Sequence, residues 1–200
     1  MVEFVYLASQ SPRRRQLLEQ LGIRYELLLP DAGEDTESLE IALENEAPVR
    51  YVKRVTDLKL DAASARLIRR QLPPAPILCS DTTVALGRTI YGKPDDILHA
   101  ERMLSELSGK THRVLTAVNI QSGQERYCAL SSSKVSFEPM TVEQISRYAA
   151  TGEPLGKAGA YAIQGRASMH VTRISGSYSG IMGLPLWETA SLLRAAGFAI

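Results

Sequence analysis

The feature that most constrains the fold of this chain is the alternation of strand-like and helix-like segments along all 200 residues. Short apolar runs predict strands, and apolar residues at helical spacing predict helices between them. The predicted strands cover 4–8, 25–29, 77–86, 89–91, 114–121, 126–137 and 169–174. The predicted helices begin near Pro12, Pro48, Asp95 or Asp96, Thr141 and Pro185. Strands that intermingle with helices, with hairpins among them, predict an α/β protein with a mixed sheet.

Several element boundaries carry local signals. Ser11 is placed to cap a helix that starts at Pro12, and Thr141 with Gln144 three residues later is a capping-box pattern. Turns between paired strands are indicated by 87–88 and 122–123. A chain of this length that shows no internal repeat is expected to form one domain over 1–200.

Composition excludes several classes of protein. Hydrophobic residues make up 44%, charged residues 22%, and the formal net charge is +1, which gives no electrostatic basis for binding nucleic acid or a membrane surface. The two cysteines lack metal-ligand spacing, and the three histidines are scattered. No apolar stretch is long enough to span a membrane, and the first residues lack the pattern of a secretory signal, so a cytoplasmic protein is expected.

The first candidate site is the basic turn between a predicted strand and a predicted helix. It contains Ser9, Ser11, Arg13 and Arg14. Backbone N–H groups and the positive end of the helix dipole favour an anion at a helix start, and arginine binds phosphate oxygens in pairs. Consecutive cations at this position oppose the dipole unless an anion is present. The turn therefore predicts a phosphate site, with a solvated basic turn as the alternative.

The second candidate site is acidic. Asp81 lies in the polar stretch 80–83 inside an otherwise apolar strand, where an unpartnered carboxylate would be costly. Glu34 lies in an acidic loop, where a solvated carboxylate is the common outcome. Carboxylates beside a triphosphate hold Mg²⁺ or Mn²⁺, or orient and deprotonate the attacking water. Both residues are candidate catalytic and metal-binding groups.

Two lysines and a glutamine complete the candidates. Lys93 and Lys157 follow glycines in tight turns, where the backbone comes close to a ligand and an ammonium group can meet a phosphate. Gln164 offers both a donor and an acceptor, which suits the edge of a nucleobase. Each signal alone is weak, since such turns are commonly plain surface.

In order along the chain, six motifs resemble the Maf family of nucleoside triphosphate pyrophosphatases. They are the segments 7–14, 80–82, 92–94, 107–112, 157–165 and 183–185. The resemblance implies two α/β lobes on a long mixed sheet with the active cleft between them, as in inosine triphosphate pyrophosphatases. It also implies a homodimer and cleavage between the α and β phosphates that depends on a divalent metal, Mg²⁺ or Mn²⁺.

The resemblance also assigns roles to residues. Ser9, Ser11, Arg13 and Arg14 match the phosphate-binding loop, and Asp81 matches a water-activating aspartate. Lys93 and Lys157 match cleft lysines, and Glu34 matches an acidic position used for metal or water, a role that Asp35 could also fill. Ser80, Gly156 and 180–182 depart from the usual family residues.

The family has a branch that acts on dTTP and UTP and another that acts on 7-methyl-GTP, and the run 157–165 is similar to the first. By this likeness Arg13, Thr82 and Gln164 choose the base. The sequence therefore predicts hydrolysis of dTTP and UTP to the monophosphate and pyrophosphate. The alternatives are a 7-methyl-GTP pyrophosphatase and a nucleotide-binding regulator of septum formation with little hydrolysis.

Overall fold

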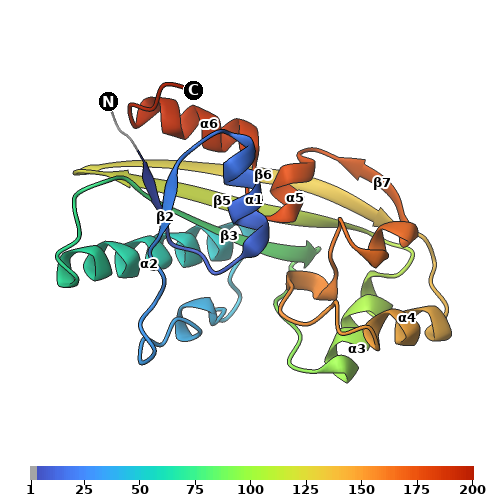
Figure 1. Cartoon of the computed structure of the whole chain (residues 1–200). Helices are drawn as coiled ribbons and strands as arrows, with labels where there is room; N and C mark the ends of the chain where they lie inside the picture. The colour runs from blue at the N-terminus through green and yellow to red at the C-terminus, as the bar shows by residue number, and fades with distance from the viewer. Residues whose placement is uncertain (1–3) are drawn as a thin grey trace.

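The computed structural model describes residues 4–200, which form one seven-stranded mixed sheet with helices on both faces (Figure 1). The sheet order is β2-β1-β3-β5-β6-β7, with β4 paired to β3. β1 pairs in parallel with β2 and β3, and the other pairs are antiparallel. The strands are β1 Val5–Leu7, β2 Tyr25–Leu27, β3 Ile77–Leu86, β4 Thr89–Tyr91, β5 Thr111–Ser122, β6 Glu125–Phe137 and β7 Val171–Ser175. The α/β class with a mixed sheet is confirmed.

The helices pack on the two faces and at one end of this sheet. They are α1 Pro12–Gln20, α2 Pro48–Arg69, α3 Ile97–Leu107, α4 Val142–Ala149, α5 Tyr178–Met182 and α6 Leu186–Ala195, with the 3₁₀ segments η1 Ser38–Glu40, η2 Ala158–Ala160 and η3 Arg166–His170. Figure 1 shows α2 on one face and α6 on the other, and both contact β5. No helix within 4–200 has the length and apolar character needed to cross a membrane.

The hydrophobic cores fall into two regions joined by the long strands. In one lobe, Leu18 of α1 and Leu193 of α6 pack on one sheet face, while Val55 of α2 packs on the other. In the second lobe, Leu104 of α3 and Ile145 of α4 pack together beside the far ends of β3, β5 and β6. The strands β3 and β5 contribute to the cores of both lobes. Side chains on these strands can therefore lie where the lobes meet.

Two local predictions differ from the structure. The last strand was predicted from Met169, but 169–170 belong to η3 and β7 begins at Val171. The short helix α5 was not predicted because five residues that include a glycine carry too little apolar periodicity. Its cap is local, since the Ser177 hydroxyl accepts from the amide of Gly180 at 3.0 Å.

Candidate active site

A cleft of about 500 Å³ lies between the two lobes. Its walls come from the turn before α1, the η1 segment, the middle of β3, the turn after β4, the 156–164 segment and the end of α5. Nine residues predicted from the sequence line it together: Ser9, Ser11, Arg13, Arg14, Asp81, Thr82, Lys93, Lys157 and Gln164. Segments that are distant in sequence therefore meet at one site.

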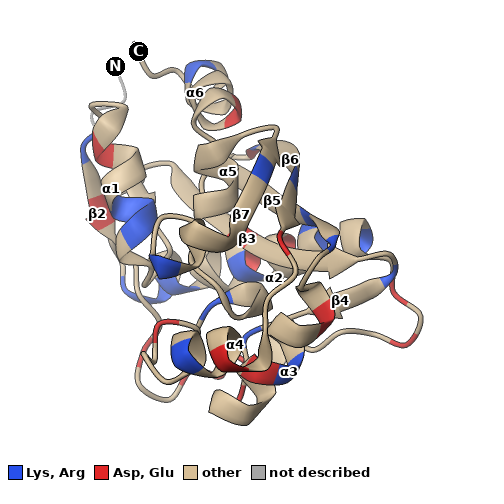
Figure 2. Cartoon of the chain, turned by 90° about the vertical axis from the view of Figure 1, so that its right-hand side faces the viewer, with Lys and Arg blue, Asp and Glu red and all other residues tan. Residues whose placement is uncertain are grey.

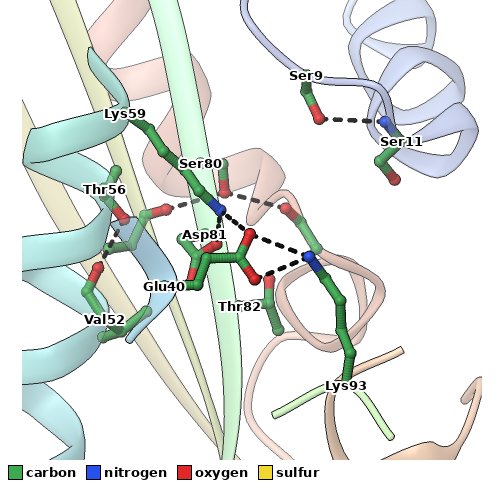
Figure 3. Close-up of polar contacts among 12 residues, drawn as sticks. Ser9, Ser11, Glu40, Val52, Thr56, Lys59, Ser80, Asp81, Thr82 and Lys93 are labelled. Carbon is green, nitrogen blue, oxygen red and sulfur yellow. Dashed lines mark hydrogen bonds and ion pairs between the residues drawn. The ribbon is translucent and has the colours of Figure 1, made fainter. Parts of the chain in front are cut away.

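The acidic centre of the cleft consists of the carboxylates of Asp81 and Glu40, which share one lysine as a hydrogen-bond donor (Figure 3). Lys59 Nζ of α2 donates to Asp81 Oδ1 at 2.5 Å and to Glu40 Oε1 at 2.7 Å. Lys93 Nζ reaches both oxygens of Glu40, at 3.0 and 2.8 Å. Burial acts against the charged form of Lys59, but the two carboxylates outweigh it and raise the pKa of Lys59. Burial opposes ionisation of Glu40 as well, and Lys59 and Lys93 nevertheless lower the pKa of Glu40.

Glu40 and Lys59 were not among the residues predicted from the sequence. Lys59 had a signal, because it lies within the apolar stripe of α2 beside the buried Val55, Thr56 and Leu60. A lysine in such a stripe implies a partner. Glu40 had none, since it ends the short segment η1 in a loop of several acidic residues. Only the packing of that loop against α2 brings Glu40 to Asp81.

Glu34 is held elsewhere. Arg66 of α2, whose residue is only 2% exposed, donates to Glu34 Oε1 at 2.5 Å and Oε2 at 3.0 Å, and to the carbonyl of Leu28 at 2.9 Å. The hydrogen bonds from Arg66 lower the pKa of Glu34. Among the described residues that line the cleft, Glu34 does not appear, whereas Arg66 does. The structure thus places Glu34 as an anchor of the acidic loop.

The basic turn is tied to the end of α5. Arg14 Nε donates to the Gly183 carbonyl at 2.8 Å, and Arg13 Nε donates to the Met182 carbonyl at 3.2 Å. The Ser9 hydroxyl accepts from Arg14 Nη1 and from the Ser11 amide, both at 3.2 Å. Ser11 occupies the N-cap position, but its side chain makes no capping hydrogen bond, contrary to the expectation. Figure 2 shows the basic first turns of α1 in blue.

Thr82 connects this turn to the sheet. Its hydroxyl lies 3.4 Å from Arg14 Nη2 and 3.0 Å from the hydroxyl of Thr116 on β5. The Ser80 hydroxyl lies 2.8 Å from the Ala117 carbonyl and 3.0 Å from the Gly183 carbonyl. The hydroxyls of Ser80 and Thr82 are therefore satisfied across the sheet and by the segment after α5, whereas the buried Thr83 hydroxyl has no hydrogen-bond partner among the described residues.

The opposite wall carries Lys157 and Gln164. Lys157 Nζ donates to the backbone carbonyl of Glu153. Burial lowers the pKa of Lys157, and the charge of Arg13 lowers it further. Gln164 is exposed within the cleft wall. Two cations that repel each other across a cleft leave a place for an anion.

The donor set at the acidic centre suits a hard divalent cation. The carboxylates of Asp81 and Glu40 both contact Lys59 Nζ and so lie close enough together to offer oxygen ligands to one metal ion. Mg²⁺ is typically bound by one or two carboxylates together with substrate phosphates. Within 4–200, no three His, Cys, Asp or Glu side chains are grouped so as to hold a metal. The substrate would have to complete the coordination shell.

Comparison with known proteins gives concordant results. A family model described as "Maf-like protein" matches residues 4–196. A protein from a Polaromonas species is 69% identical over 99% of this chain and 98% of its own length, and one from Albidiferax ferrireducens is 65% identical over the full length of both. One from Burkholderia pseudomallei is 59% identical over 98% of this chain and 95% of its own. All three carry the name dTTP/UTP pyrophosphatase.

Among solved structures, the Ham1 protein of Staphylococcus aureus covers 96% of both chains at 10% identity, with a TM-score of 0.40. This likeness is too weak to support an argument about the site.

Proposed function

This chain belongs to the Maf family, and on that premise we propose that it hydrolyses dTTP and UTP to the nucleoside monophosphate and pyrophosphate. The names of relatives that are 59–69% identical over nearly the whole chain support the substrate. The structural observation that carries the proposal is that the basic turn of α1 and the carboxylates of Asp81 and Glu40 line one cleft. Hydrolysis of a triphosphate needs cationic groups to bind the phosphates and carboxylates to activate water or hold a metal, and both must lie within the length of one triphosphate.

The basic wall binds the phosphates in this proposal. Arg13 and Arg14 supply guanidinium donors, and the start of α1 supplies backbone N–H groups. Arg14 is restrained by Ser9, Thr82 and the Gly183 carbonyl, so its orientation is set before a ligand arrives. Such preorganised charge stabilises the transition state without reorganisation during the reaction.

Asp81 is the proposed general base. Its residue is 7% exposed, and it faces the cleft from the rigid centre of β3. From there the carboxylate orients a water toward the α phosphorus and takes its proton, while pyrophosphate leaves. Lys59 and Lys93, already gathered around Asp81 and Glu40, neutralise charge on the phosphates.

We propose Mg²⁺ or Mn²⁺ as the cofactor, held by Asp81 and Glu40. A divalent cation there would neutralise phosphate charge and polarise the phosphorus. Glu40 takes the place that the sequence had assigned to Glu34, because Glu40 shares Lys59 with Asp81 while Glu34 is bound by Arg66.

Base choice is assigned to three residues, Gln164, Arg13 and Thr82. The Gln164 amide can donate to O4 of uracil or thymine or accept from N3–H, which matches a pyrimidine edge. The resemblance further supports a homodimer. A cytoplasmic location accords with substrates that are intracellular nucleotides.

The test is pyrophosphate release by the purified protein with Mg²⁺ or Mn²⁺ against dTTP, UTP, CTP, GTP, ATP, ITP and 7-methyl-GTP. We expect dTTP and UTP to be hydrolysed preferentially. Preference for 7-methyl-GTP would move the protein to the other branch of the family. Tight binding of triphosphates without turnover would favour a regulatory protein.

A further inference from the structure

We propose that Glu153 is a positioning residue that sets base discrimination by holding the backbone on both sides of Gln164. The inference rests on the proposed function, since it concerns the same cleft. Glu153 lies just after α4, outside the residues that line the cleft within 4–200. It belongs to the second lobe and acts on the cleft through the wall that carries Gln164.

The carboxylate of Glu153 holds the end of the turn that follows Gln164. The backbone amide of Arg166 donates to Glu153 Oε1 at 3.0 Å and to Oε2 at 3.2 Å. A Cβ at Gly165 would lie 2.3 Å from Oε1 and 2.6 Å from Oε2. Only a residue without a Cβ allows the Glu153 carboxylate to lie this close to the backbone. The contact therefore accounts for the glycine at position 165, directly after Gln164.

The same carboxylate reaches the start of the turn through a tyrosine. Tyr148 of α4 donates its hydroxyl hydrogen to Glu153 Oε1 at 2.9 Å, and its oxygen accepts from the amide of Ala162 at 3.3 Å. The turn itself is closed by the Gly165 amide, which donates to the Ala162 carbonyl at 3.0 Å. Gln164 thus lies in a backbone loop that is anchored at both ends to one carboxylate.

Glu153 also contacts a second substrate-binding candidate. Its backbone carbonyl accepts a hydrogen bond from Lys157 Nζ. Glu153 therefore contacts the lysine of this wall directly and the loop that carries the glutamine. The Glu153 amide in turn donates to the Thr151 hydroxyl at 3.2 Å, which fixes the residue to the end of α4. These contacts join the wall to the end of α4.

This anchoring bears on base choice for a chemical reason. A glutamine amide can present either its oxygen or its nitrogen, so it can pair with the donor-acceptor edge of uracil or with the reversed edge of cytosine. Because the amide can rotate without any movement of the backbone, discrimination requires one amide orientation to be favoured, and a loop fixed at both ends keeps the surroundings of the amide constant. With the carboxylate removed, the Arg166 amide and the Tyr148 hydroxyl lose their acceptor and the loop gains freedom.

The experiment compares the kcat/KM values for UTP and CTP in Glu153→Ala, Glu153→Gln and the control Glu143→Ala, which removes an exposed glutamate from the first turn of the neighbouring helix α4. We expect Glu153→Ala to reduce the UTP preference about tenfold or more, mainly through UTP. Glu153→Gln keeps one oxygen acceptor and is expected to restore part of the preference. Glu143→Ala should leave the preference unchanged.

A merely structural role for Glu153 would lower the amount of active enzyme and reduce both kcat/KM values alike. An unchanged UTP:CTP ratio in a folded Glu153→Ala protein therefore overturns the inference while the proposed function stands. If that variant does not fold, Tyr148→Phe removes the hydroxyl alone and must still lower the ratio. A wild-type protein that hydrolyses neither dTTP nor UTP would overturn the proposed function and this inference together.

Discussion

At the scale of single residues, the acidic centre shows why a charge can be kept inside a sheet. Asp81 is nearly buried, and its ammonium partner comes from another element, α2. An isolated buried carboxylate carries a large desolvation cost, which a directly paired ammonium group offsets. The same lysine joins Asp81 to Glu40, so the carboxylates of two distant segments share one ammonium group, and Lys93 adds a second at Glu40.

We expect Asp81→Asn and Glu40→Gln each to reduce pyrophosphate release by about a hundredfold or more, because each removes a carboxylate from the reacting centre. Glu34→Gln is the matched comparison and should retain most of the turnover, since its partner Arg66 anchors the loop rather than the substrate. Steady-state rates and circular dichroism of the three variants test this. Loss of turnover in Glu34→Gln alone would reverse the assignment.

At the scale of elements, α4 shows how a short helix is defined locally. The Thr141 hydroxyl accepts from the Gln144 amide at 3.3 Å, and the Gln144 side chain accepts from the Thr141 amide at 2.7 Å. This is the capping box expected from the sequence. The helix is eight residues long, Tyr148 lies in its last turn and Glu153 follows shortly after it, so the stability of α4 bears on the cleft wall.

Thr141→Ala should lower the free energy of unfolding by about 1 kcal/mol, because one amide of the first turn loses its acceptor. Urea denaturation gives the value, with Ser146→Ala on the exposed side of the same helix as the control. An equal midpoint for Thr141→Ala and wild type would show that the cap contributes nothing measurable.

At the scale of the whole molecule, the second lobe buries a neutral histidine. His112 is 1% exposed, contacts the Tyr161 hydroxyl through Nε2 at 2.8 Å and packs edge-on against Phe137 and Tyr161. Burial lowers the pKa of His112 from 6.5 to about 4. Below about pH 6.5 the imidazole of His112 binds a proton in the unfolded chain but stays neutral in the folded chain down to about pH 4. The free energy of unfolding therefore falls as the pH drops from 6.5 to about 4.

Between pH 6.5 and 5 we expect wild type to lose roughly 1 to 2 kcal/mol of unfolding free energy from His112, and His112→Asn to lose less. The paired carboxylates do not obscure this, because the lowered pKa values of Glu34, Glu40 and Glu46 move their contribution below this range. Denaturant titrations at several pH values supply the slopes. Equal slopes for the two proteins would exclude His112 as the cause.

Much of the fold could be predicted because its signals are local. The start of α2 at Pro48, the turn at 87–88 and the Asp96 cap of α3 depend on residues within a few positions of one another. The positions of Asp81, Lys93 and Gln164 in one cleft came from their motifs and the family resemblance, and the cleft contains them all. Their catalytic and binding roles remain predictions.

The sequence by itself determined the class of the fold, most element boundaries and the family, because periodicity, caps and motifs are written in short stretches. The tertiary structure alone decided which glutamate meets Asp81. Glu34 and Glu40 belong to the same acidic loop, and the choice between them depends on how Arg66 and Lys59 of α2 pack against that loop. A contact between residues so far apart leaves no periodic trace, since it is set by the packing of whole elements rather than by neighbours along the chain.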